Sequence, residues 1–81
     1  MAERKDYKAN LMLDLRGIEC PLNFVKTKLQ LDKMKKGEVL EVLLDDGEAI
    51  ESVPPSIIEE GHTIVLKENY KNYYKITILR N

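Results

Sequence analysis

Hydrophobic and polar residues alternate along four short stretches of the chain, which is the pattern of half-buried β-strands. The alternation predicts strands at residues 11–15, 38–44, 63–68 and 73–80. In the first strand, one face carries Leu11, Leu13 and Leu15. In the other three, the side chains expected to point inward are Leu40, Val42 and Leu44; Ile64 and Leu66; and Tyr74, Ile76 and Ile78. A hairpin loop at residues 69–72 is expected to join the last two strands.

A first helix is predicted from Cys20-Pro21 to about Lys36, followed by Gly37, a residue common after helix ends. Proline is favoured at the first helical position, which makes Cys20 the expected capping residue. The helix carries two apolar stripes: Phe24, Leu31 and Met34 with Thr27, and Leu22, Val25 and Leu29. The larger stripe is expected to face the sheet, because a helix on one sheet buries only one stripe well.

A second helical region is predicted in two pieces. A short helix spans Glu48–Val53, and Pro54-Pro55 then interrupts it, because a proline inside a helix lacks an N–H and clashes with the preceding turn. A further turn or two is expected up to Gly61. The element order is therefore β-α-β-α-β-β. It predicts an α+β fold, a two-layer α/β sandwich in which both helices cover one face of a four-stranded mixed sheet.

Length and composition fit one small globular domain: 81 residues, 43% hydrophobic and 33% charged, with a net charge of -1. Residues 1–10 are polar and predict a lead-in, and residues 11–81 predict the domain. Near-neutral charge speaks against non-specific nucleic-acid binding, which needs a basic excess. The N-terminus lacks the apolar run of a signal peptide, and no stretch is long enough to cross a bilayer. We therefore expect a cytoplasmic protein without a membrane contact.

The chain has one cysteine, which excludes an internal disulfide and a cysteine-based metal site. Asp45, Asp46 and Glu48 supply too few ligands for calcium, and a turn that caps the next helix is the better interpretation. His62 stands near no evident ligand or base in the sequence, so packing at a turn or strand edge is favoured. We expect no metal and no cofactor.

Cys20 is the candidate for chemistry, because a helix N-terminus carries partial positive charge and stabilises a thiolate. The backbone N–H groups of Leu22 and Asn23 are the expected donors to its sulfur. Arg16 could add positive charge nearby, whereas Glu19 opposes it. A free cysteine is otherwise most often a small buried hydrophobic residue. Spacing alone leaves these two interpretations open.

The segment Leu13-Asp14-Leu15-Arg16-Gly17-Ile18-Glu19-Cys20-Pro21 resembles the signature of the TusA/SirA/YedF family of small sulfur-carrier proteins. The similarity continues at Met34–Glu38, Asp45-Asp46 and Glu60-Gly61-His62, so it covers nearly the whole chain after residue 10. The resemblance implies a β-α-β-α-β-β sandwich and makes residues 11–81 a single TusA-like domain. It also implies that Cys20 accepts sulfur as a persulfide from a desulfurase or rhodanese-like donor protein and passes it to an acceptor protein.

One position departs from the family pattern. The usual motif is Cys-Pro-x-Pro, whereas this chain has Cys20-Pro21-Leu22-Asn23. Proline at the third helical position has no N–H, so Asn23 is expected to restore one donor to the sulfur. The predicted site is Cys20 as the catalytic residue, supported by Pro21, Leu22, Asn23, Arg16 and Gly17. A docking surface for a partner is expected at Val25, Lys26 and Leu29.

The resulting hypothesis is a sulfur carrier, with any tRNA contact indirect and with the chain a monomer or a weak dimer. A competing hypothesis is a regulatory interaction module that uses the first helix, with Cys20 only structural. A nucleic-acid-binding domain is a third class, which the near-neutral charge disfavours.

Overall fold

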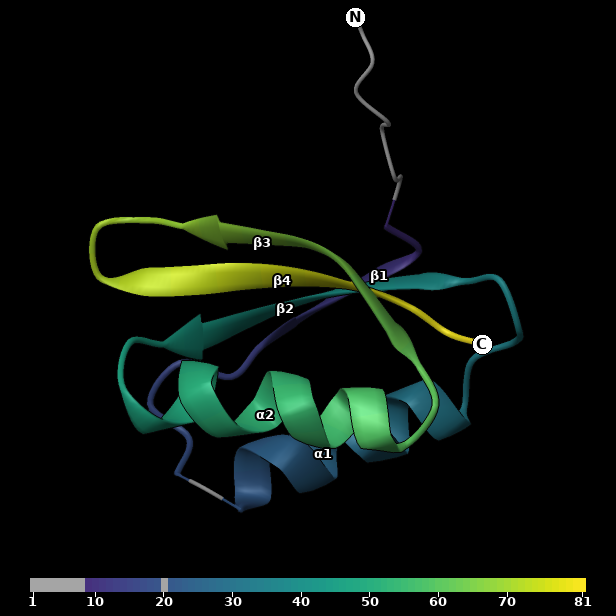
Figure 1. Cartoon of the computed structure of the whole chain (residues 1–81), viewed down its shortest axis with the longest axis horizontal. Helices are drawn as coiled ribbons and strands as arrows, with labels where there is room; N and C mark the ends of the chain where they lie inside the picture. Colours follow the sequence, from purple (N-terminus) through teal and green to yellow (C-terminus); the bar gives the residue numbers. More distant parts are fainter. Residues whose placement is uncertain (1–8, 20) are drawn as a thin grey trace, which may run out of the picture.

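The computed structural model describes residues 9–19 and 21–81. Most of the predicted lead-in at residues 1–10, and Cys20 itself, lie outside the described residues. Along the chain the elements are β1 (Leu11–Asp14), α1 (Leu22–Asp32), β2 (Val39–Asp45), α2 (Glu48–Glu59), β3 (Thr63–Asn69) and β4 (Tyr73–Leu79). The predicted element order is confirmed, and the predicted hairpin connects β3 to β4 (Figure 1).

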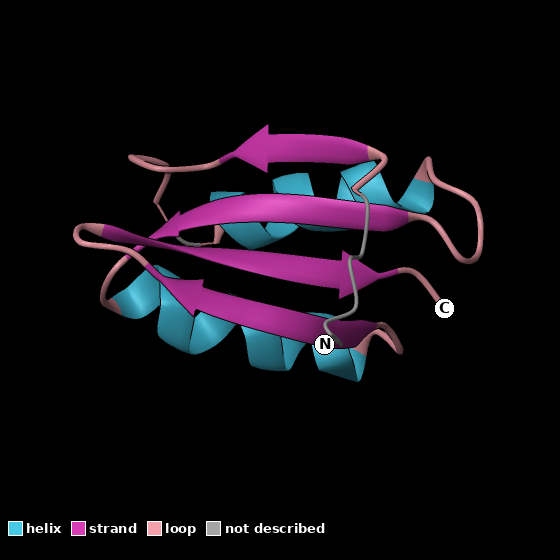
Figure 2. Cartoon of the chain, turned by 90° about the horizontal axis from the view of Figure 1, so that it is seen from above, coloured by secondary structure: helices cyan, strands magenta, loops and turns pink. Residues whose placement is uncertain are grey.

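The four strands form one mixed sheet in the order β1-β2-β4-β3. β1 runs parallel to β2, whereas β4 is antiparallel to both of its neighbours. Both helices cover the same face of the sheet, and the other face carries no helix (Figures 1 and 2). The predicted α+β sandwich with two helices on one face is therefore confirmed.

The hydrophobic core lies between the central strands and the helices. Its fully buried members are Leu31 of α1, Leu40, Val42 and Leu44 of β2, Val53 and Ile57 of α2, and Ile76 and Ile78 of β4. All these strand positions were expected on the buried face, because they recur at every second residue of β2 and β4. The core is thus centred on β2 and β4, and β1 and β3 form the two edges of the sheet.

The first helix is shorter than predicted, because it ends at Asp32 rather than near Lys36. The next two N–H groups, of Lys33 and Met34, turn back to carbonyls three residues earlier, which tightens and closes the last turn. Arg80 donates from Nε to the carbonyl of Leu31 at 2.6 Å, so this carbonyl at the helix end accepts two hydrogen bonds. The chain then turns and buries Met34 in the core.

The second helix is continuous, so the predicted break at Pro54-Pro55 is wrong. An interior proline removes a helix hydrogen bond, and its cost is about 3 kcal/mol. In this helix Val53, Pro54 and Ile57 are buried, and Val53 and Ile57 belong to the core. Burial of that apolar face offsets the lost bonds, which the local pattern alone could not show.

Leu66 was expected inward but is 46% exposed, and the cause is an irregularity in β3. The pairing of β3 with β4 shifts register between Ile64 and Leu66, as at a β-bulge. An extra residue in one strand moves the following side chains to the opposite face of the sheet. Leu66 therefore lies opposite Thr77, and Lys67 takes the inward-facing register opposite Ile76.

No helix in the described part of the chain is long and apolar enough to cross a membrane.

Candidate functional site

The loop that leads from β1 toward position 20 is held against the sheet by hydrogen bonds and apolar contacts. Leu15 is buried, and its N–H donates to the carbonyl of Leu43 at 3.0 Å. Ile18 packs against the core and donates its N–H to the carbonyl of Leu15 at 3.1 Å. Two apolar anchors and two backbone hydrogen bonds thus fix the course of the loop before residue 20.

Asp45 holds the middle of this loop. Its Oδ2 accepts a 2.6 Å hydrogen bond from the N–H of Gly17, across 28 positions of sequence. Gly17 has a φ of 83°, a conformation that favours glycine, which explains why glycine stands at this turn. Asp45 was predicted to belong to a turn that caps the following helix, but α2 has Gly47 at its cap and no side-chain cap bond. Sequence reasoning therefore missed Asp45 as a support of the site.

Arg16 forms an ion pair with Asp14. Its Nε and one terminal nitrogen donate to the two carboxylate oxygens at 2.9 and 2.8 Å. The guanidinium also lies over the ring of Tyr73, 4.7 Å from the ring centroid. These hydrogen bonds lower the pKa of Asp14 to about 2. The structure thus brings Arg16 to Asp14 and Tyr73, and its predicted proximity to Cys20 lies outside the described residues.

The helix that follows position 20 begins one residue later than predicted. Leu22 is the first helical residue, and Pro21 rather than Cys20 occupies the capping position. The N–H of Asn23 donates to the carbonyl of Glu19 at 3.1 Å. That N–H thus has a backbone acceptor, and its predicted hydrogen bond to the sulfur lies outside the described residues.

The side chain of Asn23 is fully buried, whereas the prediction for this residue concerned only its backbone N–H. Its Oδ1 accepts a 2.7 Å hydrogen bond from the N–H of Phe24. Its Nδ2 has no hydrogen-bond partner among the described residues. One turn on, Thr27 is also buried, and its hydroxyl donates to the carbonyl of Asn23 at 2.9 Å. The start of α1 is thus packed around polar groups, one of which lacks a described partner.

The second apolar stripe of α1 is exposed, as predicted. Leu22, Val25 and Leu29 are 50%, 40% and 53% exposed, and Lys26 beside them is exposed too. The first stripe faces the core through Thr27, Leu31 and Met34, with Phe24 packed partly buried against it. An apolar row therefore extends along the surface of α1 from the residues that follow position 20.

A depression of about 350 Å³ lies beside the same loop. It is lined by Gly17, Ile18, Glu19, Asn23, Asp45, Asp46, Glu48 and Ala49. Its acidic side chains do not gather into a cation site: the described residues contain no cluster of three metal-ligating side chains.

His62 and the hairpin tyrosines have packing roles, as the sequence analysis favoured. His62 accepts a 3.3 Å hydrogen bond at Nδ1 from the N–H of Asn81, and its burial lowers the pKa of the imidazole. Tyr70 and Tyr73 stack with ring centroids 5.0 Å apart at the hairpin. These groups stabilise turns and strand ends.

The arrangement of the elements places the chain in a known class of fold. A solved SirA-like protein from Desulfitobacterium hafniense superposes on it with a TM-score of 0.74, covering 85% of this chain and 95% of that one at 21% identity. This likeness concerns the fold of the two-layer sandwich.

Sequence comparison then gives the family. Residues 11–80 match the family described as sulfurtransferase TusA, and the chain belongs to it. A protein from Archaeoglobus fulgidus named "Putative sulfur carrier protein" is 45% identical over 67 residues, 83% of this chain and 76% of that protein. One from Thermotoga maritima with the same name is 37% identical over 73 residues, 89% of this chain and 92% of that protein. YedF of Escherichia coli is 33% identical over 61 residues, 75% of this chain and 79% of that protein.

Proposed function

We propose that this protein is a sulfur carrier that holds a transferable sulfur atom as a persulfide on Cys20. The observation that carries the proposal is the family match over residues 11–80, which spans the segment Leu13–Pro21 with the only cysteine of the chain. The similar proteins named as sulfur carriers support the same assignment.

The transfer requires a thiolate and a sulfur donor, and it needs no external oxidant. The Cys20 thiolate attacks the outer sulfur of a donor protein's persulfide. The new S–S bond forms on Cys20 as the donor's S–S bond breaks, and the donor leaves as a thiolate. The proton of the persulfide stays with the transferred sulfur or passes to solvent. In the second half the acceptor attacks that outer sulfur, and Cys20 returns to the thiolate.

The residues around position 20 suit this chemistry in two ways. The Gly17–Asp45 hydrogen bond and the buried Leu15 fix the loop before it, and α1 begins directly after Pro21. A helix N-terminus stabilises an anionic sulfur and lowers a thiol pKa. Pro21 limits the backbone at the turn, and Leu22 supplies a backbone N–H near the helix start.

The exposed row of α1 is our candidate for the docking surface of a partner. Val25 and Leu29 present apolar side chains, and Lys26 adds a positive charge among them. Exposed apolar side chains that are contiguous with a reactive residue are typical of an interaction site. The proposed partners are a donor protein with a persulfide and an acceptor protein, in the cytoplasm and without a cofactor.

Intact mass spectrometry tests the proposal. The chain is incubated with a cysteine desulfurase and cysteine, or with a rhodanese and thiosulfate. We expect the mass of one sulfur atom to be gained, to be lost again with a reductant, and to be absent from Cys20→Ser. Two results would instead favour the regulatory module. One is a wild-type chain that gains no sulfur from either donor, and the other is a Cys20→Ser chain that keeps the protein's function in the cell.

A further inference from the structure

The carboxylates of the protein fall into two groups. Seven of those in the described part of the chain have a partner: Asp14, Asp32, Glu38, Glu41, Asp45, Glu60 and Glu68 bind a cation or a backbone N–H. The others have no ion pair or side-chain hydrogen bond with a described residue: Glu19, Asp46, Glu48, Glu51 and Glu59. All five of these line two adjoining depressions that share Asp46. The unpaired negative charge is therefore concentrated on one side of the molecule.

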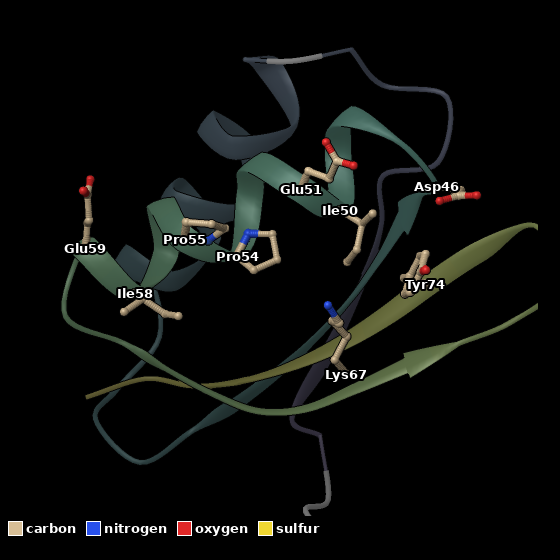
Figure 3. Close-up of a pocket in the computed structure, with 9 residues that line it drawn as sticks. All are labelled: Asp46, Ile50, Glu51, Pro54, Pro55, Ile58, Glu59, Lys67 and Tyr74. Carbon is tan, nitrogen blue, oxygen red and sulfur yellow. The ribbon is translucent and has the colours of Figure 1, made fainter.

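The larger depression is a groove of about 650 Å³ between α2 and strands β3 and β4 (Figure 3). Its apolar lining comes from Ile50, Pro54, Pro55 and Ile58 of α2 and from the ring of Tyr74. Ile58 is 55% exposed. The carboxylates Asp46, Glu51 and Glu59 stand around it. The groove thus combines an apolar surface with negative charge, and it begins where β2 ends.

Lys67 is the one basic residue among those that line this groove. Its side chain points from β3 toward α2 (Figure 3), and its Nζ lies 5.8 Å from the ring centroid of Tyr74. The register shift after Ile64 is what brings Lys67 to this face of the sheet. Three carboxylates against one ammonium group leave the groove negative, and the attraction extends over about 10 Å at moderate salt.

The smaller depression extends this acidic surface to the residues that flank position 20. Glu19 and Glu48 line it, and Asp46 connects it to the groove. Asn23 also lines it, with a fully buried side chain whose Nδ2 has no described hydrogen-bond partner. A buried amide N–H without an acceptor is unfavourable, so a carbonyl oxygen brought by a partner would relieve that cost.

We propose that this acidic groove binds a basic segment of the protein that exchanges sulfur with Cys20, with an apolar side chain against Ile58 and flanking Lys or Arg against the carboxylates. The identity of the partner rests on the proposed function, whereas the chemistry of the segment follows from the groove itself. Charge complementarity decides the occupant: an acidic or neutral segment would leave the five carboxylates unpaired. The surface of α1 carries lysines instead, so the two faces beside position 20 would select partner segments of opposite charge.

The test uses the full ¹⁵N-labelled chain with Cys20→Ser, so that no covalent step contributes. The probe is a short capped peptide of alternating leucine and lysine, and its leucine–glutamate counterpart is the charge control. We expect amide shifts to concentrate at Glu51, Ile58 and Lys67, and binding to weaken about tenfold when salt rises from about 0.05 to 0.5 M. The glutamate peptide should not bind.

Matched variants separate the groove from general electrostatics. Glu51→Gln with Glu59→Gln should raise the peptide Kd by about fivefold, whereas Asp32→Asn with Glu38→Gln, an equal change of charge, should raise it by less than about twofold. Ile58→Ser should weaken binding, and Leu29→Ser, at a similarly exposed leucine of α1, should not. Each variant is first checked by its unfolding midpoint.

Three results would overturn the proposal: shifts centred on α1, equal weakening by both pairs of variants, or concentration-dependent shifts without peptide, which would indicate a second copy as the occupant. Sulfur loading of the wild-type chain is measured separately. A loading failure with groove binding intact counts against the carrier role alone, and intact loading with no groove binding counts against the groove alone.

Discussion

The two helices lie on the same face of the sheet (Figure 1), yet they differ in the side chains that they bury. α2 buries five apolar residues: Ala49, Ile50, Val53, Pro54 and Ile57. α1 buries Leu31 with the polar Asn23 and Thr27, and it exposes Leu22, Val25 and Leu29. Most apolar side chains of α2 are therefore buried and stabilise the fold, whereas several of those on α1 are exposed to solvent.

This difference separates a region that holds the fold from the row of α1 that we propose as a docking surface. Burying Asn23 with an unpaired Nδ2 and exposing three apolar side chains both lower stability relative to the reverse arrangement. Proteins rarely optimise stability at functional sites, and local rules fail there most often. Directly after position 20, α1 buries polar side chains and exposes apolar ones. This arrangement is consistent with the sulfur-transfer site that we propose there.

The largest effect should come from the core side of α2. Ile57→Ala removes a fully buried side chain and should lower the free energy of unfolding by about 2–5 kcal/mol. Leu29→Ala, on the exposed row of α1, should change it by less than about 0.5 kcal/mol. Urea unfolding monitored by circular dichroism measures both. Similar losses in the two variants would remove the distinction between the helices.

The next effect should be a gain of stability within α2. Pro55 is exposed inside the helix, and Pro55→Ala restores an N–H that can donate to the carbonyl of Glu51. After the greater flexibility of the unfolded chain is subtracted, the gain should be about 1–2 kcal/mol. Pro54→Ala is the control: it restores an N–H too, but at a buried position it also leaves a cavity. A Pro55→Ala chain that is less stable would show that the prolines support the helix.

The stability of the loop before position 20 should depend on the carboxylate of Asp45 and not on that of Asp46. Asp45→Ala removes the acceptor of the Gly17 N–H and should cost about 1–2 kcal/mol. Asp46→Ala, which removes a carboxylate without a described partner, should be nearly neutral. Hydrogen exchange at the Gly17 amide reports the bond directly. Unchanged exchange in Asp45→Ala would contradict its supporting role.

The smallest effect concerns His62, far from the helix start. Its pKa in the folded protein lies below the ordinary value of 6.5, because burial disfavours the charged form. The unfolded chain therefore binds more protons below pH 6.5, and stability should fall as the pH drops through that range and be unaffected above it. His62→Gln should remove this part of the pH dependence. The same slope in both proteins would show that other groups are responsible.

Periodicity predicted the sheet, the element order and the buried faces of β2 and β4, because these residues alternate with regular spacing. It failed at Leu66, since a one-residue register shift inverts every later side chain and leaves no local signal in the sequence. It also failed at Pro54-Pro55, where tertiary burial outweighs helix propensity.

At the candidate site, the sequence pointed to Gly17 and to the exposed row of α1. It could not reveal Asp45 as the partner of Gly17, because the two residues meet only through the pairing of β1 with β2. It also could not show that the Asn23 N–H donates to the carbonyl of Glu19, because Glu19 lies outside the expected helix. Both hydrogen bonds depend on the course of the backbone in the folded chain, which local sequence patterns do not show.

The most direct experiment asks whether the exposed apolar side chains of α1 are needed for sulfur transfer to Cys20. The rate at which a cysteine desulfurase loads sulfur onto the chain is followed by intact mass in the wild type and in the triple variant Leu22→Ser, Val25→Ser, Leu29→Ser. The account predicts loading that is slower by about tenfold, with an unfolding free energy within about 0.5 kcal/mol of the wild type. Equal loading rates in two equally stable proteins would contradict it.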